Sequence, residues 1–153
     1  MEAVNFIALC VAIVVVLGIG VGVMTWAYVG KGSISLLFQE PISSLPELTA
    51  TEAGNKAAVY FQQGIESYKS ANYRQAVEQF NQAIQLVSSL AEAYHNRGLA
   101  FANLRSDGDA VADLLKASEL YQEQGKGEGI AIIKQNLKAL KQRKIERENR
   151  NKK

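Results

Sequence analysis

The chain has 153 residues, enough for one modest folded domain with appendages. Its formal net charge is +2, but residues 134–153 carry nine Lys or Arg and two Asp or Glu, whereas the rest carries eight and 13. The single cysteine excludes an intramolecular disulfide framework, so nothing in the sequence demands an oxidising compartment.

The first 32 residues are predicted to form a membrane anchor. No charged residue occurs from Ala3 to Gly30. A helix of that length would measure roughly 42 Å at ~1.5 Å per residue, enough to cross the ~30 Å hydrocarbon core. The alternative is a cleaved signal peptide, which would have a basic start and a shorter apolar segment, whereas this chain has Glu2. We therefore expect an integral, single-pass membrane protein.

Two features refine this predicted anchor. Lys31 is the first basic residue after the apolar run, which by the positive-inside rule places the following domain on the cytoplasmic or stromal side. Gly18 and Gly22 lie on one helical face, where two bare backbones permit close packing on another membrane helix. Such spacings also arise by chance in glycine-rich spans.

Residues 33–50 are predicted to be a linker, mostly extended, because both prolines of the chain, Pro41 and Pro46, lie in it. The apolar residues 36–38 have two open interpretations. They dip into the membrane interface, or they pack on the first repeat.

Residues 51–124 are predicted to form two helical hairpins, because the segment 57–90 recurs in 91–124 with a period of 34 residues. The first helix is expected to begin near Ala50 or Thr51, since Thr49 and Glu52 have the spacing of a capping box. The recurring pairs are Tyr60 and Tyr94, Gly64 and Gly98, Ala76 and Ala110, Phe80 and Leu114, and Ala83 and Ala117.

These landmarks resemble the tetratricopeptide repeat, whose pattern places an aromatic residue before Leu-Gly and an Ala before Phe. Here Gln63 and Arg97 replace that Leu, and the closing Pro of the family is absent. The resemblance rests on Tyr60-x-x-Gln63-Gly64 with Ala76-x-x-x-Phe80-x-x-Ala83, and on Tyr94-x-x-Arg97-Gly98-x-x-Phe101 with Ala110-x-x-x-Leu114-x-x-Ala117. With its anchor, the chain also resembles small membrane-anchored tetratricopeptide factors that assemble complexes in photosynthetic membranes such as the thylakoid.

Residues 125–153 are predicted to form a capping helix with a basic tail. Ile130, Ile133, Leu137 and Leu140 form one apolar stripe, which we expect to pack on the last helix of the second unit. The tail indicates an anionic neighbour, either membrane lipid or an acidic protein face, and we do not expect nucleic acid. The alternative is a solvated helix end. The tail residues are Lys144, Arg147, Arg150, Lys152 and Lys153.

The family resemblance implies a groove for a protein partner, lined by the first helix of each hairpin. A mixture of aromatic and amide side chains there favours an extended peptide or a partner helix. The alternative is that Phe61 and Ile65 are simply buried by the linker or by the capping helix. The implied groove residues are Phe61, Ile65, Tyr68, His95, Asn96, Leu99 and Asn103.

The sequence indicates no catalytic, cofactor or metal site. His95 is the single histidine and has no acid–base partner that the sequence identifies. Asp107, Asp109 and Asp113 lack the alternation and the distal Glu of a calcium loop. Ser106 and Asp107 as helix caps, with Asp109 in the first turn, explain this cluster better. We therefore expect neither an enzyme nor a cofactor.

The predicted fold is all-α, with a transmembrane helix followed by two hairpins and a capping helix. The predicted function is a membrane-tethered protein-binding module, a scaffold or assembly factor for a membrane complex. Two alternatives remain open. One is an accessory subunit bound through its glycine-rich span, and the other is a receptor for targeting peptides.

Overall fold

The computed structural model describes residues 36–43 and 51–152. The predicted anchor, with Gly18 and Gly22, lies outside these residues. The described part contains helices and no strand. None of its helices is long and apolar enough to cross a membrane. The helices are α2 (Glu52–Lys69), α3 (Tyr73–Leu86), α4 (Ala91–Asn103), α5 (Asp107–Glu123) and α6 (Gly127–Asn151).

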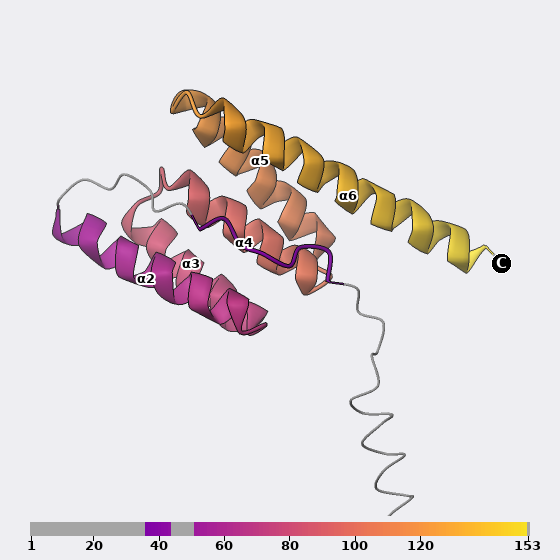
Figure 1. The fold of residues 1–153 in the computed structure, drawn as a ribbon, viewed down its shortest axis with the longest axis horizontal. Helices are drawn as coiled ribbons and strands as arrows, with labels where there is room; N and C mark the ends of the chain where they lie inside the picture. Colours follow the sequence, from indigo (N-terminus) through magenta and orange to yellow (C-terminus); the bar gives the residue numbers. More distant parts are fainter. Residues whose placement is uncertain (1–35, 44–50, 153) are drawn as a thin grey trace, which may run out of the picture. The chain divides into compact units, whose positions relative to one another are not determined.

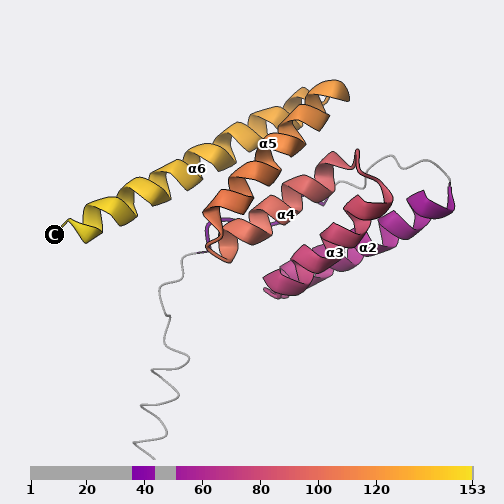
Figure 2. The same ribbon diagram turned by 180° about the vertical axis from the view of Figure 1, so that it is seen from behind.

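The helices stack in chain order, as Figure 1 shows. α2 pairs with α3 and α4 pairs with α5, so each predicted unit is a helical hairpin. α3 packs on α4 to join the hairpins, and α6 packs on α5 (Figure 2). This arrangement confirms the all-helical prediction and is consistent with tetratricopeptide hairpins.

The first helix begins one residue later than expected, and a different threonine caps it. Thr51 is the N-cap residue, and its side-chain oxygen accepts a hydrogen bond of 3.0 Å from the amide of Gly54. This bond satisfies one of the amides that the first turn of a helix leaves without an intrahelical partner. The capping-box assignment to Thr49 and Glu52 was therefore wrong, although the position of the helix start was close.

The two recurring glycines mark the closest approach of the helices within each hairpin. A Cβ atom built on Gly64 would lie 2.5 Å from a ring carbon of Phe80, a distance that no real contact reaches. A Cβ atom on Gly98 would lie 3.2 Å from the carbonyl oxygen of Ala110. The glycines therefore recur because a side chain at either position would push the paired helices apart.

The 34-residue period extends to the backbone of the turns. Ala71 ends the first hairpin turn with φ 59°, and Arg105 occupies the equivalent place with φ 67°. In each turn the next amide donates to a carbonyl five residues earlier, at 2.8 and 2.9 Å. These are the left-handed helix ends in which glycine is the usual residue, so both non-glycine residues are strained there.

The predicted apolar stripe of α6 faces the repeats. Ile133 and Leu140 are buried, and Ile130 and Leu137 pack partly buried against the same core. α6 thus closes the stack by covering the apolar face of α5, as terminal helices of repeat arrays do. The helix continues to Asn151, well beyond this stripe.

Candidate functional site

All of the residues predicted to line the groove are buried, none being more than 6% exposed. They face three different neighbours, so they do not form one open surface. This result follows from the central place of α4, which contacts α3 and α5 and contributes side chains that reach α6 and residues 36–43.

Phe61 and His95 point away from the predicted groove. The Phe61 ring packs within the first hairpin, with its centroid 5.7 Å from that of Phe80. His95 faces the capping side, where its Nε2 lies 2.8 Å from Nδ2 of Asn136 on α6. Its Nδ1 lies 3.5 Å from the hydroxyl of Tyr121 on α5. Ile65 and Leu99 belong to the apolar core.

Tyr68 and Asn103 hold the residues that precede the repeats. The Asn103 Oδ1 atom accepts hydrogen bonds of 3.2 Å from the amides of both Leu37 and Phe38. Its Nδ2 donates to the Phe38 carbonyl at 2.7 Å and to the Tyr68 hydroxyl at 2.9 Å. The Tyr68 hydroxyl in turn donates to the same Phe38 carbonyl at 2.8 Å. One residue of each hairpin therefore binds the same peptide unit.

Asn96 holds a second point on the same segment. Its Oδ1 accepts from the amide of Ile42 at 2.7 Å, and its Nδ2 donates to the carbonyl of Ile42 at 2.9 Å. Between the two points, Pro41 is buried, whereas Gln39 and Glu40 are exposed. We call residues 36–43 the groove segment.

The groove segment contains no helix, in agreement with the extended linker that the prolines predict. Leu37 and Phe38 pack partly buried against the core. Of the two open interpretations of residues 36–38, packing on the repeat domain is therefore the one that describes Leu37 and Phe38. Figure 1 shows the segment, in dark purple, running along α4. It runs antiparallel to α4, because Phe38 meets Asn103 at the C-terminal end of that helix and the later residue Ile42 meets Asn96 in its middle.

Arg97, which departs from the family pattern, links three helices. Its guanidinium donates to both carboxylate oxygens of Asp113 on α5, at 2.7 and 2.8 Å, and to the Asn81 side chain on α3 at 2.9 Å. Its CZ atom also lies 5.3 Å from the centre of the Tyr94 ring. The hydrogen bond from Arg97 to Asp113 is the main reason why the pKa of Arg97 is raised. Asp113 is therefore the ion-pair partner of Arg97, and it lies beyond the first turn of α5, which contains Asp107 and Asp109.

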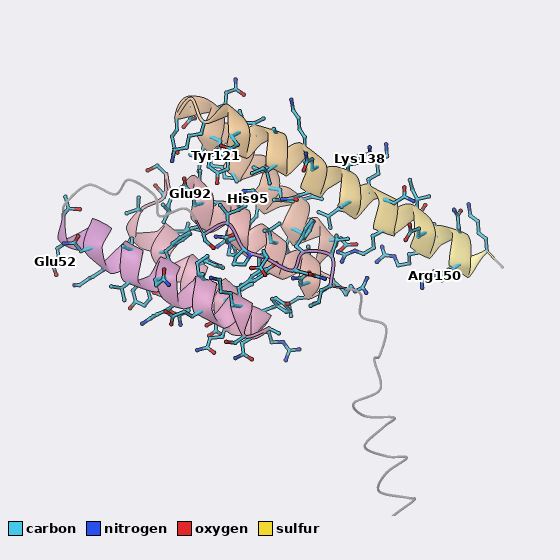
Figure 3. All side chains as sticks on the ribbon, in the orientation of Figure 1. Glu52, Glu92, His95, Tyr121, Lys138 and Arg150 are labelled. Carbon is cyan, nitrogen blue, oxygen red and sulfur yellow. The ribbon has the colours of Figure 1, made fainter. Side chains whose placement is uncertain are left out.

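The electrostatic surroundings of His95 keep its ring neutral. The side chain is fully buried, and burial lowers its pKa to about 4 by removing water from the charged form. The neighbouring Tyr121 has a raised pKa for the corresponding reason, since burial disfavours its phenolate. Figure 3 shows the two side chains close together, between α4 and the α5–α6 pair. This neutral polar cluster fixes how α6 sits on the repeats.

The basic tail is exposed along the end of α6. Of its predicted residues, Lys144, Arg147, Arg150 and Lys152 are exposed and Lys153 lies outside the described residues. Figure 3 marks Arg150 near the end of the helix. Arg147 also lies 3.8 Å from Asp107, at the start of α5. Asp107 binds the buried Arg143 as well, so this aspartate joins α6 to α5.

Two functional features were missed because they depend on residues far apart in the chain. Asn96 and Asn103 were predicted to lie on one helix face, and the groove segment that they bind lies 54 to 66 residues away in the chain. The pairing of Arg97 with Asp113 has a sequence signal, because a charged residue at a position where the repeat family has leucine requires a partner. Among the described residues, no group of His, Cys, Asp and Glu side chains is arranged to hold a metal ion.

Comparison with known proteins agrees with the hairpin geometry. The family model of the TPR repeat matches residues 65–104, from the last part of α2 through α3 and α4. A 77-residue stretch, 50% of this chain, is 36% identical to Protein STIP1 homolog of Dictyostelium discoideum. That stretch covers 14% of the Dictyostelium protein. No solved structure matches the chain. The chain is therefore one that carries a TPR repeat, within an all-helical domain closed by α6.

Proposed function

We propose that the chain is a membrane-tethered protein-binding module, which acts as a scaffold or assembly factor for a membrane protein complex. The observation that carries the proposal is the path of an extended peptide segment along α4, held by Asn96 and Asn103 through its backbone. TPR repeats are stacked helical hairpins whose curved surfaces serve in binding. The functional chemistry is therefore binding, and we propose no enzymatic activity.

The proposed tether rests on the amino-acid sequence of residues 1–32. The uncharged run from Ala3 to Gly30 has the length and composition of a single membrane-spanning helix. Lys31 favours a cytoplasmic or stromal location for the repeats. The resemblance to anchored assembly factors favours a photosynthetic membrane.

The exposed basic end of α6 supports a second, electrostatic contact. Basic residues close to a membrane are attracted by anionic headgroups, and each contributes about 1 kcal/mol near the surface. The same charges would also suit an acidic protein face. Either neighbour would add to the affinity of a short groove that two hairpins alone provide.

A receptor for targeting peptides is the second candidate, and the groove segment favours it. A site that holds an eight-residue, non-helical segment of its own chain has the dimensions of a peptide-binding site. The third candidate function is that of an accessory subunit, held in a complex by packing at Gly18 and Gly22. It is supported by the sequence of the span alone.

Co-purification from native membranes in mild detergent tests these functions. We expect the tagged full-length chain to enrich one or a few membrane-complex proteins, and a chain lacking residues 1–32 to lose them. Partners confined to immature complexes indicate an assembly factor, and a stoichiometric partner in the mature complex indicates a subunit. Saturable binding of presequence peptides indicates a receptor. If the full-length chain enriches no protein above an untagged control, the proposal is wrong.

A further inference from the structure

The hydrogen bonds that the helices make to the groove segment all involve its backbone. Asn96 pairs with both the amide and the carbonyl of Ile42, and Asn103 does the same with Phe38. An asparagine side chain carries one acceptor and one donor group, which match the backbone of any residue. These hydrogen bonds therefore specify an extended backbone in one register, and leave the choice of side chains to the apolar contacts.

The spacing of the two asparagines matches the spacing of the two bound residues. Asn96 and Asn103 are seven residues apart, so they are separated by about 10 Å along α4. Phe38 and Ile42 are four residues apart, and four extended residues span at most about 14 Å. A bent, extended segment antiparallel to α4 therefore satisfies both asparagines together.

The polar side chains beneath the groove segment can form hydrogen bonds to water when the segment detaches. Tyr68, Asn96 and Asn103 are buried beneath the segment. Polar groups that become exposed exchange protein hydrogen bonds for bonds to water, so the net loss is only about 1 kcal/mol for each bond. An apolar floor would instead lose the full benefit of burial.

The segment itself is only partly buried. Pro41 is buried and Leu37, Phe38 and Ile42 are half-buried, whereas Gln39 and Glu40 are exposed. Its attachment therefore combines six neutral hydrogen bonds with the apolar contacts of a few side chains. This is the balance expected of an element that detaches locally while the helices stay folded.

We propose that the groove segment is a displaceable internal occupant of a peptide-binding groove. Its release opens the α4 face to an extended peptide from a partner, with apolar side chains at the places of Phe38 and Ile42. The inference rests on the proposed binding function and names the site at which that function is regulated. An attached segment competes at a local concentration in the millimolar range, so the closed chain binds external peptides weakly.

A peptide identical to residues 36–43, fluorescently labelled, is the direct probe. The full-length chain in mild detergent is compared with a variant carrying Leu37→Ser, Phe38→Ser and Ile42→Ser. We expect the triple variant to bind the peptide at least about tenfold more tightly than the natural chain, because its own segment competes less. Adding Asn103→Ala to the triple variant should reverse this gain.

The matched control carries Gln39→Ser and Glu40→Ser, two exposed positions of the same segment. It should bind the peptide as weakly as the natural chain does. A folded triple variant that binds no better than this control would overturn the proposal, and would make the segment a permanent part of the core.

Hydrogen exchange in the unaltered chain gives a second, independent test. The amides of Phe38 and Ile42 should exchange through a local opening, at least about tenfold more often than the α4 amides of the same domain. Exchange of both groups only through global unfolding contradicts the proposal, even if the triple variant fails to fold. A partner found by co-purification that binds the chain equally well with Asn103→Ala would leave the binding function intact and reject this site.

Discussion

Arg97 on α4 and Asp113 on α5 form a two-point ion pair, with Nε 2.7 Å from one carboxylate oxygen and Nη2 2.8 Å from the other. The side chains are 17% and 10% exposed, so solvent screens the pair only weakly. Arg97 stands at the position where the tetratricopeptide pattern has a leucine. The Arg97 guanidinium also donates a hydrogen bond to the Asn81 side chain on α3, so it links the two hairpins.

Replacing this arginine by the family residue should destabilise the chain. Arg97→Leu leaves the Asp113 carboxylate buried without its cation, and we expect a loss of about 3 kcal/mol in the free energy of unfolding. Adding Asp113→Asn should recover more than about 1 kcal/mol, because the second change removes the stranded charge. Urea unfolding followed by the helical circular dichroism signal measures both effects.

The matched control for this experiment is Lys116→Met, which breaks an exposed ion pair within α5, the helix that carries Asp113. Lys116 and Glu119 are 42% and 59% exposed, so water screens the pair and the loss should be much smaller than that of Arg97→Leu. Equal losses for Arg97→Leu and Lys116→Met would contradict the structural role of the Arg97 pair.

His95 should make the stability of the domain sensitive to mild acid. Burial lowers its pKa to about 4, below the 6.5 of an ordinary histidine. The unfolded chain therefore binds a proton first as the pH falls, and the stability contributed by the neutral ring is lost between pH 6.5 and 4. We expect this group to account for about 2 kcal/mol of lost stability between pH 7 and 5.

The comparison variant is His95→Gln, which keeps a polar side chain that does not titrate. Unfolding curves at pH 7, 6 and 5 should show a shallower decline in stability for this variant. Parallel pH profiles of the two chains would show that the folded-state pKa of His95 is close to normal.

Asp107 should contribute more to the stability of the domain than its neighbour Asp109, although both lie in the first turn of α5. Asp107 pairs with Arg143 and Arg147 of α6, and Arg143 is buried with Nε and Nη1 lacking other partners. We expect Asp107→Asn to cost about 2 kcal/mol.

Asp109→Asn changes the same helix-terminal charge at an exposed position, so it should cost about 0.5 kcal/mol. The difference between the two variants isolates the contact with α6. Limited proteolysis within α6 should accelerate for Asp107→Asn only. Similar rates in both variants would argue against this ion pair as an attachment of the cap.

The left-handed turn residues offer a route to a more stable domain. Ala71→Gly and Arg105→Gly each remove the clash that a side chain suffers at positive φ, and each should stabilise the chain by about 1 kcal/mol. Thermal unfolding checks this, with a higher midpoint expected for both variants.

The control is Ala131→Gly, the same kind of change at an exposed position inside α6. It should instead destabilise by about 1 kcal/mol, since glycine loses more backbone entropy in a helix. If all three changes destabilise the chain, the turns do not adopt the left-handed conformation in solution.

Local patterns predicted the helical part of this chain well, because each pattern depends on neighbouring residues. The 34-residue echo of Gly64 and Gly98 predicted two hairpins, and the close contacts at both positions explain why the echo exists. The stripe through Ile133 and Leu140 likewise predicted the packed face of α6. The threonine at the start of α2 was harder to assign, since Thr49 and Thr51 are both acceptable caps by residue type.

The sequence predicted less of the candidate site than of the helices. By itself the sequence determined the helices, their hairpin pairing, and the face of α4 that carries Asn96 and Asn103. Only the tertiary structure decided that His95 turns toward α6 and that the asparagines hold residues 36–43. The physical reason is that helix periodicity is a local property, whereas the partner of a buried polar group is selected by every segment that can reach it.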